Sequence, residues 1–483
     1  MIRRPQPPPG PWLVVGLGRA GVAAAEALAS FGDASAVKAW DEAFTPSVRA
    51  AARALRRRGI AVALGGDGAS ALDPSVCSVV KAPGVPADAP ILRGAAARGL
   101  QAVDEFELGW RLSSRPIIAI TGTNGKSTTA ALIVEALAAT GTRPPLAGNT
   151  NFGPPLSAVP RIGGSPVVAE VSSYQLEYCP SFLPEVAVLT NVTEEHLWRH
   201  RTMAAYAALK RRLFVRDELA SPLAVLNLDD ATGFELAGQV RDRGGVAVTY
   251  GWGADADYRI AHASWTLERG NMTLATPDGS VELSTRHPGH HNAANVAAAF
   301  AVADSLGLER GTSIPAIERA PRVPGRLESL DEGQRFHAIV DFAHTRDGVT
   351  QTIKAIRAAV DGRIITVFGA VGSAEDPMRR ATGRAARALS DVLILTTGNL
   401  RGEPRMLPLQ GLRAGATELS RGTMCVELDR RRAIAKAIEL AEPGDAVVVL
   451  GRGPLARMVT GRSGSSFPFD DRQVMRELLR EST

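Results

Sequence analysis

The sequence lacks several features that would assign it to a specialised class of protein. No stretch of its 483 residues approaches the ~20 uninterrupted apolar residues that a membrane-spanning helix needs. The first residues, MIRRPQPPPGPW, include basic side chains but no apolar segment behind them, so no secretory signal peptide is predicted. Cysteine is scarce, because Cys77, Cys179 and Cys425 are far apart, odd in number and outside any metal-binding pattern. These absences favour a cytoplasmic location, where thiols stay reduced.

A large excess of one charge is also absent. Lys and Arg together number 55 and Asp and Glu 50, which gives a formal net charge of +5. The basic runs 56–58 and 430–432 lie in helix-like stretches with apolar neighbours, and this predicts solvated helix faces rather than a nucleic-acid surface. A mildly basic chain also suits an anionic nucleotide ligand. We therefore expect a monomer that binds neither nucleic acid nor membrane.

The composition is that of an ordinary globular protein, with 45 % hydrophobic and 22 % charged residues. Short apolar runs alternate with helical patterns, as in α/β folds with parallel sheets. We predict three α/β domains in series: a Rossmann-like domain over 1–113, a central P-loop-type ATPase domain over 114–320, and a C-terminal domain of dinucleotide-fold type over 321–483. Breakers at 113–116 and 321–324 set these boundaries.

The individual elements follow from the same patterns. A helix is predicted over 20–31, directly after the first strand, and a second, Ala-rich helix over 293–306. An alternating stretch over 258–283 predicts antiparallel strands. The remaining predicted strands cover 12–15, 36–40, 61–64, 78–81, 117–120, 167–170, 186–191, 337–341, 363–368, 392–396 and 446–450.

A glycine-rich loop follows the strand predicted over 117–120. It reads TGTNGKSTT over residues 121–129 and leads into a helical pattern. Its glycines let backbone amides approach phosphate oxygens, and the N-terminus of the following helix favours negative charge. Lys126 would reach the β- and γ-phosphates, and Ser127 or Thr128 would bind Mg²⁺. Although Ile120 stands where a P-loop has its first glycine, the context predicts an ATP site made by Gly122, Thr123, Asn124, Gly125, Lys126, Ser127 and Thr128.

A second glycine loop, GLGRAG, follows the first predicted strand. Its glycines are Gly16, Gly18 and Gly21, and Asp41 ends the next strand. This pattern fits a dinucleotide site, a site for another nucleotide, or a simple packing turn between strand and helix. The phosphate-type loop further along the chain favours a nucleotide-bearing substrate over a redox cofactor.

Polar residues follow several predicted strands of the central domain, at the sheet edge where α/β folds bind ligands. Glu170 ends one strand, and His196 follows shortly after another, so oxygen ligands and an imidazole lie near the phosphate loop and suit Mg²⁺. Asn292 and Asn295 are three residues apart at the start of a helix and suit an adenine edge. From the last domain, Arg326 would contact a phosphate, and Asp341 would hold a ribose or orient a phosphate contact.

Taken in order, these stretches resemble the Mur ligase family of ATP-dependent amide-forming enzymes, which build the stem peptide of peptidoglycan. The matching motifs fall in all three predicted domains, so the resemblance covers nearly the whole chain. They are TGTNGKSTT (121–129), AGNTNFG (147–153), EVSSYQLE (170–177), NVTEEHLWRH (191–200), YAALKRRLF (206–214), GHHNAAN (289–295), PGRLE (324–328) and DFAHTRDG (341–348).

The resemblance implies a reaction that uses ATP and Mg²⁺. ATP would phosphorylate the carboxylate of a UDP-muramoyl substrate, and the amine of a free amino acid would then displace phosphate from the acyl phosphate. By motif match, Lys126, Ser127 and Glu170 would handle the phosphates and one metal ion. His196 would bind the second metal ion together with Lys210, which stands at the position of the family's carbamylated lysine. Arg326 and Asp341 would complete the ATP site when the domains close.

Different domains resemble different members of the family. GLGRAG, Asp41, the KAPG turn (81–84) and SSYQLE (172–177) look like the glutamate-adding MurD type. The last domain looks more like the MurE type, which adds the third residue, in VDFAHTRDG (340–348), VFGAVGSAEDPMRR (367–380) and GDAVVVLGRG (444–453). The MurD likeness implies UDP-substrate contacts by Gly16, Leu17, Gly18, Arg19, Ala20, Asp41, Pro83, Gly84 and Asn149.

The motifs that read the amino acid depart from the MurE pattern. Its DNPR appears here as GNLR (398–401), and its GKGHE as GRGPL (451–455), so the acidic group that reads the far amine of a diamino acid is missing. The usual Asp-His-Leu-Asp around the metal-binding histidine becomes EHLW (195–198). These changes bear on the amino acid and on the pathway.

We therefore expect an ATP-dependent ligase of peptidoglycan precursor synthesis that adds an amino acid, glutamate first, to UDP-N-acetylmuramoyl-L-alanine. The alternatives within the class are a MurE-like ligase that adds diaminopimelate or lysine to the UDP-muramoyl dipeptide, and a relative in a specialised pathway. From other classes, a nicotinamide-dependent oxidoreductase would use GLGRAG, but no hydride-transfer constellation supports it. A non-catalytic nucleotide sensor is the third option.

Overall fold

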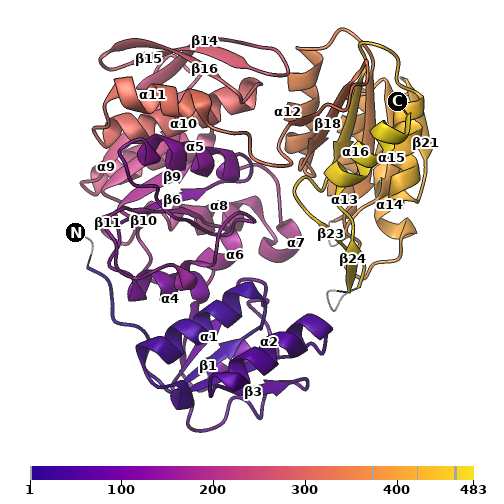
Figure 1. The fold of residues 1–483 in the computed structure, drawn as a ribbon. Coiled ribbons are helices and arrows are strands. Elements are labelled where there is room, and N and C mark those ends of the chain that lie inside the picture. Colours follow the sequence, from indigo (N-terminus) through magenta and orange to yellow (C-terminus); the bar gives the residue numbers. More distant parts are fainter. Residues whose placement is uncertain (1–2, 373–374, 421, 462–464, 483) are drawn as a thin grey trace.

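The computed structural model describes residues 3–372, 375–420, 422–461 and 465–482. Three sheets follow one another along the chain, each in its own part of the sequence (Figure 1). This confirms the expectation of an α/β fold with three domains in series. The first sheet ends at Asp104, the second runs from Ile117 to Thr285, and the third begins at Glu328. The boundaries at 113/114 and 320/321 fall between these sheets and stay a prediction.

The first sheet has five parallel strands in the order β3-β2-β1-β4-β5. This is the arrangement of doubly wound nucleotide-binding sheets, with the reversal of order beside the loop after β1. In that loop, a Cβ atom on Gly21 would lie 1.7 Å from the carbonyl oxygen of Gly16, so only glycine lets the helix pack there. The elements are β1 (Trp12–Val15), α1 (Arg19–Phe31), β2 (Val37–Asp41), α2 (Pro46–Arg57), β3 (Ala61–Leu64), β4 (Ser78–Lys81), α3 (Pro90–Ala97) and β5 (Gln101–Asp104).

Strand β5 leads directly into α4 (Glu105–Leu112), which connects the first two domains. Asp104 caps this helix by accepting a hydrogen bond from the Phe106 amide at 3.0 Å. The same carboxylate pairs with Lys81 Nζ at 2.9 Å, and both side chains are fully buried. Phe106 and Trp110 belong to the apolar cluster on one face of the central sheet, so α4 is fixed from both sides.

The central sheet has nine strands in the order β16-β15-β14-β13-β12-β9-β6-β8-β7. The strands from β7 to β14 are parallel, and β14 to β16 form the antiparallel extension that the alternating pattern predicts. The strands are β6 (Ile117–Thr121), β7 (Leu146–Gly148), β8 (Val167–Glu170), β9 (Val186–Leu189), β12 (Leu223–Asn227), β13 (Val246–Gly251), β14 (Tyr258–Trp265), β15 (Gly270–Thr276) and β16 (Gly279–Thr285).

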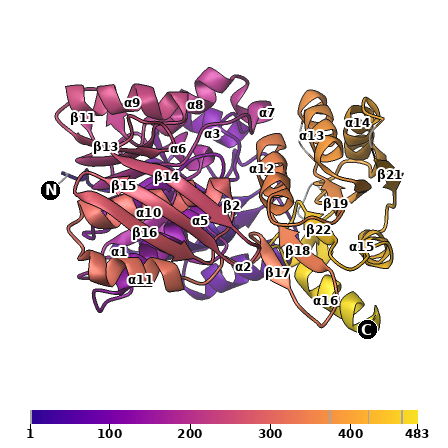
Figure 2. The ribbon, with the colours of Figure 1, turned by 90° about the horizontal axis from the view of Figure 1, so that it is seen from above.

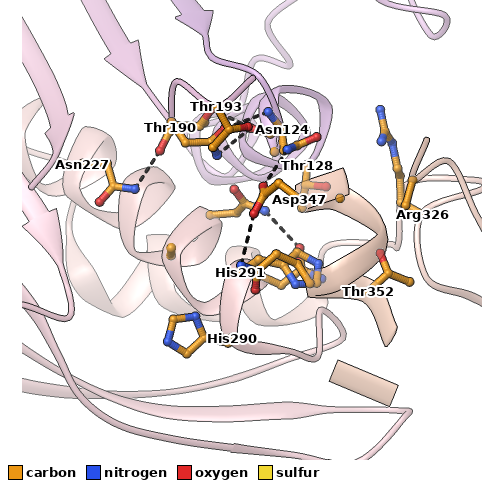
Figure 3. Close-up of a pocket in the computed structure, with 18 of the residues that line it drawn as sticks. Asn124, Thr128, Thr190, Thr193, Asn227, His290, His291, Arg326, Asp347 and Thr352 are labelled. Atoms are coloured by element: carbon orange, nitrogen blue, oxygen red, sulfur yellow. Dashed lines mark hydrogen bonds between the residues drawn. The ribbon is translucent and has the colours of Figure 1, made fainter. Parts of the chain in front are cut away.

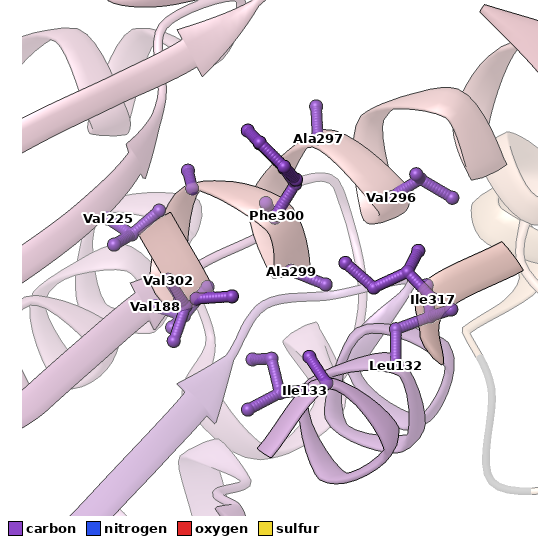
Figure 4. Close-up of a cluster of buried hydrophobic side chains, with 14 of the residues drawn as sticks. Leu132, Ile133, Val188, Val225, Val296, Ala297, Ala299, Phe300, Val302 and Ile317 are labelled. Atoms are coloured by element: carbon purple, nitrogen blue, oxygen red, sulfur yellow. The ribbon is translucent and has the colours of Figure 1, made fainter. Parts of the chain in front are cut away.

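Helices cover both faces of the central sheet, because successive residues of each strand point to opposite sides. Ile118 packs in a cluster with α5 (Lys126–Ala138), α10 (His290–Ser305) and α11 (Arg310–Arg319) (Figure 4). Its neighbour Ile117 packs in the other cluster, which includes α4 and α9 (Ala231–Asp242). Short elements at the sheet edge are α6 (Ser173–Leu176), α7 (Leu197–His200), α8 (Met203–Arg211), β10 (Val215–Arg216) and β11 (Leu219–Ala220).

The third sheet has the order β17-β18-β22-β19-β20-β21, parallel except at β17. Helices α12 to α14 lie on one side and α15 and α16 on the other (Figure 2). The elements are β17 (Glu328–Leu330), β18 (His337–Asp341), α12 (Arg346–Arg357), β19 (Ile364–Ala370), α13 (Asp376–Leu389), β20 (Val392–Thr397), α14 (Met406–Thr417), β21 (Thr423–Val426), α15 (Arg430–Glu439), β22 (Ala446–Leu450), β23 (Arg457–Val459), β24 (Ser466–Pro468) and α16 (Asp471–Ser482).

The segment before β1 is bound to the central domain, although it precedes the first. Arg4 donates hydrogen bonds to the carbonyl oxygens of Ser113 and Arg115, and its guanidinium lies 3.2 Å from a carboxylate oxygen of Glu185. The same guanidinium lies over the Trp110 ring. The N-terminal segment therefore forms a strap across the connection between the first two domains.

One prediction about surface charge is wrong. Arg56–Arg58 is exposed as expected, but Arg430 is 3 % exposed and forms a two-bond ion pair with Asp471, both bonds being 2.7 Å. The partner lies in α16, which the local pattern does not reveal. Ser373 and Ala374, within the MurE-like stretch 367–380, lie outside the described residues. None of the helices described here is long and apolar enough to cross a membrane.

Candidate active site

A cavity of about 270 Å³ lies where the central and C-terminal domains meet (Figure 3). Its walls come from the loop before α5, the carboxyl ends of β9, β12 and β18, and the start of α10. The carboxyl ends of parallel strands converge in this way at the ligand sites of open α/β sheets. The predicted ATP residues that line it are Asn124, Gly125, Ser127, Thr128, Asn292, Asn295, Arg326 and Asp341.

The glycine loop has the backbone geometry of a phosphate-binding turn. Gly125 has φ +86° and directly precedes α5, so the first amides of the helix face the cavity. A Cβ atom on Gly125 would lie 2.3 Å from Asn295 Oδ1, and one on Gly122 would lie 1.8 Å from Thr190 Oγ1. Lys126 Nζ donates to the carbonyl oxygens of Gly122 and Thr123, each at 2.8 Å. The loop therefore excludes side chains and holds one ammonium group beside its backbone.

Ser127, at the start of α5, lies beside Glu170, the last residue of β8, so two oxygen-bearing side chains meet there. The Ser127 hydroxyl donates to Glu170 Oε2 at 3.0 Å. Glu170 is 2 % exposed, and its Oε1 is buried with no hydrogen-bond partner. A hydroxyl beside a carboxylate with one free oxygen suits Mg²⁺, which takes few protein ligands and completes its shell with phosphates and water. These two residues therefore fit the predicted metal.

His196 lies at a sharp turn that precedes α7. Its φ is +58°, its Nδ1 lies 3.0 Å from the Tyr174 hydroxyl, and its Nε2 lies 3.4 Å from Glu195 Oε1. Burial lowers the pKa of His196 to about 4, although the Glu195 carboxylate opposes this shift. The imidazole is therefore neutral near pH 7, which is the form that binds metal ions. Among the described residues, no three His, Cys, Asp or Glu side chains form a complete metal cluster.

Lys210 lies on α8 with its amine turned into the protein. Its side chain is 1 % exposed, and Nζ donates to the Gly122 carbonyl oxygen at 2.7 Å. Burial, together with the positive charge of Lys126, holds the pKa of Lys210 well below the usual value of a lysine. Burial thus favours the neutral form of an amine that lies directly behind the glycine loop.

Asn292 and Asn295 lie together on the first turns of α10. Asn295 Nδ2 donates to Asn292 Oδ1 at 3.0 Å, and Thr129 Oγ1 donates to Asn295 Oδ1 at 3.2 Å. Nearby, the rings of Trp252 and His290 are stacked with centroids 4.1 Å apart. Two amides and an aromatic pair are suited to a nucleobase, which needs edge hydrogen bonds and a flat apolar surface.

Arg326 and Asp341 reach the cavity from the C-terminal domain. Arg326 stacks over the Phe342 ring, and its Nε has no hydrogen-bond partner. Asp341 accepts hydrogen bonds from the amides of Leu327 at 2.7 Å and Ala343 at 2.8 Å. The Asp341 carboxylate therefore fixes the segment that carries Arg326, and Arg326 remains free for an anion.

Two further contacts join the domains across the cavity. Asn124 Nδ2 donates to Asp347 Oδ2 at 2.9 Å, and His344 Nε2 lies 3.2 Å from Glu195 Oε1. His196 and His344 flank the Glu195 carboxylate and hold its pKa far below the usual value, despite its burial. The central and C-terminal domains are thus hydrogen-bonded to each other around the site.

The residues predicted for the UDP substrate, except Leu17, line two neighbouring cavities that share part of their walls. One, of about 480 Å³, lies in the first domain and is lined by Gly16, Gly18, Arg19, Ala20, Asp41, Pro83 and Gly84. Leu17 is buried, and its amide donates to Asp41 Oδ2 at 2.6 Å, so one oxygen of that carboxylate holds the glycine loop. The other, of about 210 Å³, contains Asn149 and shares Arg19, Ala20 and Pro83 with the first.

Several cavity residues were not predicted. Asn227 and the acidic pair Asp229 and Asp230 follow β12 as Glu170 follows β8, so the strand-end rule that identified Glu170 also applies to them. Asp347 and His344 belong to a motif quoted above, but nothing in their local sequence indicates that they contact the central domain.

The chain was compared with known proteins. Residues 120–303 match the family described as "Mur ligase middle domain", and residues 325–453 match "Mur ligase, glutamate ligase domain". The chain is 35 % identical over 392 residues to the UDP-N-acetylmuramoyl-L-alanyl-D-glutamate--2,6-diaminopimelate ligase of Thermosynechococcus vestitus, covering 76 % of this chain and 77 % of that protein. The ligase of the same name from Streptomyces coelicolor is 34 % identical, covering 76 % of each chain.

Solved structures show the same fold. The crystal structure of UDP-N-acetylmuramate-alanine ligase from Thermotoga maritima superposes with a TM-score of 0.60 at 18 % identity, covering 98 % of this chain and 99 % of that one. A structure titled UDP-N-acetylmuramoyl-L-alanyl-D-glutamate--2,6-diaminopimelate ligase gives a TM-score of 0.52 at 24 % identity, covering 92 % of each chain.

Proposed function

The chain belongs to the Mur ligase family, and from this premise we propose that it uses ATP to join an amino acid to UDP-N-acetylmuramoyl-L-alanyl-D-glutamate. The sequence pattern of the first domain favours addition of glutamate to UDP-N-acetylmuramoyl-L-alanine instead. Addition of glutamate has less support than addition of the third residue, because the relatives at 33–35 % identity are all named for the latter step.

The observation that carries the proposal is the cavity between the central and C-terminal domains. It brings together the glycine loop, Ser127 with its partner Glu170 directly behind it, and Arg326, whose Nε has no hydrogen-bond partner. A triphosphate placed with its adenine near Asn292 would reach the glycine loop with its terminal phosphate. The acceptor would enter from the cavities of the first domain, with its carboxylate directed to the same loop.

Catalysis by these residues is largely positioning and charge neutralisation. Lys126 and Arg326 would stabilise the negative charge of the γ-phosphoryl group as it moves to the acceptor carboxylate. The acyl phosphate then has a good leaving group, and the amine attacks its carbonyl carbon while phosphate departs. When bound, Mg²⁺ held by Ser127 and Glu170 would screen phosphate charge. Contacts across the domain interface, such as Asn124–Asp347, would keep water away from the acyl phosphate.

Lys210 is proposed to react with carbon dioxide. Its Nζ would add to the carbon atom and release a proton, which leaves a carbamate anion near His196. Burial favours the neutral amine that this addition requires. The carbamate and His196 would then hold the second metal ion that the family resemblance implies.

The amino acid is the part of the reaction that the C-terminal motifs leave most open. Asn399 Oδ1 is bound by Arg452 at 3.1 Å and by the Val459 amide at 3.0 Å, so it supports the protein's own structure. Position 455 carries Leu, which offers no charge to a second amine. A monoamino acid therefore remains an alternative to diaminopimelate, and we propose a cytoplasmic pathway in either case.

The test is phosphate release with ATP and Mg²⁺ over a grid of substrates. The acceptors are UDP-N-acetylmuramate, its L-alanyl derivative and its L-alanyl-D-glutamyl derivative. Each is paired with D-Glu, L-Glu, L-Lys, meso-diaminopimelate and L-Ala. We expect release only with the dipeptide acceptor. Release that needs the L-alanyl acceptor and a glutamate would instead restore the glutamate-adding interpretation.

A further inference from the structure

The small cavity between the first two domains contains an acidic side chain that has no part in the proposed binding of ATP, metal or UDP. Glu105, the first residue of α4, lines this cavity together with Arg19, Asn149 and Gln175. Its side chain is 1 % exposed. Oε1 accepts a hydrogen bond from the Ser157 amide at 2.7 Å, but Oε2 is buried with no partner.

A buried oxygen without a partner costs folding free energy, so it needs an explanation. The neighbouring acidic groups are fully engaged: Asp104 pairs with Lys81, and Glu107 accepts from Arg111 and from the amides of Ser181 and Phe182. Glu105 is the exception on this helix. Glu105 lines a cavity with a polar wall, and it belongs to none of the apolar clusters of the core.

The position of the small cavity indicates which part of the acceptor would occupy it. It shares Arg19, Ala20 and Pro83 with the larger cavity of the first domain. At its other end Asn149 follows β7, and its backbone amide donates to the carbonyl oxygen of Glu170. The small cavity thus lies between the larger cavity of the first domain and the end of β8. A molecule with its nucleotide in the larger cavity and its carboxylate at the phosphate loop would pass through the small one.

We propose that Glu105 binds the acceptor, and that its free Oε2 hydrogen-bonds an oxygen atom in the segment between the diphosphate and the reacting carboxylate. This inference rests on the proposed function, because it takes the acceptor to be a nucleotide-linked sugar acid. The sugar and alanyl parts of that segment carry hydroxyl and amide groups without charge, and a carboxylic acid donates to such oxygens. Glu105 is thus a binding residue, separate from the groups that handle phosphate.

The surroundings of Glu105 favour its protonated form. Burial raises its pKa to about 7; the side chain and the amide of Ser157 oppose this shift, and the Asp104 carboxylate adds to it. The charged group on the facing wall is Arg19, whose Nη2 donates to the Gly153 carbonyl oxygen at 2.6 Å. A bound acceptor would displace water from the cavity and stabilise the neutral acid further.

The experiment compares the binding of two ligands by calorimetric titration at pH 6 and pH 8.5. UDP occupies only the larger cavity, whereas UDP-N-acetylmuramoyl-L-alanyl-D-glutamate also crosses the small one. For Glu105→Ala at pH 6, we expect the muramoyl ligand to bind about 3- to 10-fold more weakly, which corresponds to one lost hydrogen bond, with UDP unchanged.

The variant Glu105→Gln keeps a donor that does not titrate. We expect it to bind the muramoyl ligand nearly as well as wild type at pH 6, and more tightly than wild type at pH 8.5, where Glu105 has lost its proton. A merely structural role would not reverse this order with pH. Ser157→Ala tests the same shift from the other side, because it keeps the amide that Glu105 uses but removes a side chain that lowers the Glu105 pKa. UDP should bind unchanged, and the muramoyl ligand should keep its affinity to a higher pH than in wild type.

The role of Glu105 and the identity of the acceptor are tested separately by these measurements. If wild type binds the muramoyl ligand and both Glu105 variants bind it equally well at both pH values, the role of Glu105 is wrong. Equal weakening of UDP and of the muramoyl ligand would overturn it as well. If wild type binds UDP but gains nothing from the muramoyl part, the proposed acceptor itself is wrong and the role of Glu105 falls with it.

Discussion

Buried charges in this protein are mostly paired, and the strength of each pair depends on how completely water is excluded. Arg430 and Asp471 are 1 % and 0 % exposed at their side chains and share two hydrogen bonds. Asp471 also lies 3.5 Å from Arg452, so one carboxylate neutralises two buried guanidinium groups. Removing it would leave both cations without a counter-charge inside the C-terminal domain.

Asp471→Asn should therefore destabilise the protein severely. We expect a loss of about 3–5 kcal/mol in the free energy of unfolding, because an uncompensated buried charge remains. The measurement is urea unfolding followed by circular dichroism. The matched control is Asp376→Asn, which breaks an exposed pair with Arg380 and should leave the unfolding midpoint unchanged. Similar midpoints for the two variants would contradict the energetic role of the buried pair.

Glu105 should make the stability of the protein depend on pH. Its pKa is about 7 in the folded protein against 4.5 for the free side chain, so the unfolded chain loses the proton first as pH rises. The stability of the folded state therefore falls as pH rises from about 4.5 to 7, by up to about 3 kcal/mol in total, and stays lower above pH 7. Glu105→Gln removes this effect.

The difference in unfolding free energy between Glu105→Gln and wild type should thus favour the variant more at pH 8 than at pH 4.5. Urea titrations at the two pH values measure it, and contributions that do not titrate cancel in the comparison. A difference that is independent of pH would mean that Glu105 is already ionised at pH 4.5.

At the scale of elements, the site depends on loops fixed by a small number of contacts. Helix α7 is only four residues long, yet Arg199 from it donates to Glu177 Oε1 at 2.7 Å and to the Val85 carbonyl oxygen at 3.0 Å. Val85 lines the larger cavity of the first domain, and Tyr174 beneath Arg199 hydrogen-bonds His196. One short helix therefore joins the wall of the proposed acceptor site to the proposed metal ligand.

The glycine loop is the element whose conformation is least tolerant of change. In Gly125→Ala, the added methyl group would meet Asn295 Oδ1 at 2.3 Å, and the residue would have to keep a φ of +86°. The helix start must then move, and misplacing one phosphate-binding amide should reduce turnover roughly 100-fold or more. Phosphate-release assays and ATP titration measure the effect.

Gly141→Ala is the control for backbone strain alone. Gly141 has φ +102°, but no atom lies within 4 Å of the added methyl group. We expect a modest loss of stability of about 1–2 kcal/mol and normal turnover. If both variants retain activity, the loop does not position phosphate.

At the scale of the whole molecule, the N-terminal strap determines how firmly the first domain is held. Arg4→Ala removes its charge-assisted hydrogen bonds to the connection between the domains. Each such bond contributes about 1.5–3 kcal/mol in partly buried surroundings, so the connection should open more often. We expect faster tryptic cleavage after Arg111, at the end of α4, measured by mass spectrometry, with Arg3→Ala as an exposed neighbouring control. Equal cleavage rates for Arg4→Ala and wild type would show that the strap does not keep this connection closed.

The sequence predicts the sheets well because each buried parallel strand has a local pattern, a short apolar run between two turns. Strands β1, β3, β4, β8, β18 and β22 have the predicted bounds. The stretch that became α3, β5 and α4 was missed, since eight-residue helices around a four-residue strand give little periodicity. The phosphate loop was predicted from its letters, but its contact between Asn124 and Asp347 spans 223 residues and has no local signal.

The strap also has a consequence for the order in which the protein is made. Arg4 leaves the ribosome well before its partner Glu185, which lies 181 positions later in the chain. The first domain can therefore complete its sheet during synthesis, but its final orientation must wait until β9 has been translated. If translation paused after the first domain and before Glu185, that domain would be folded but not yet fixed in orientation. The strap would fix it only when the central sheet begins to form.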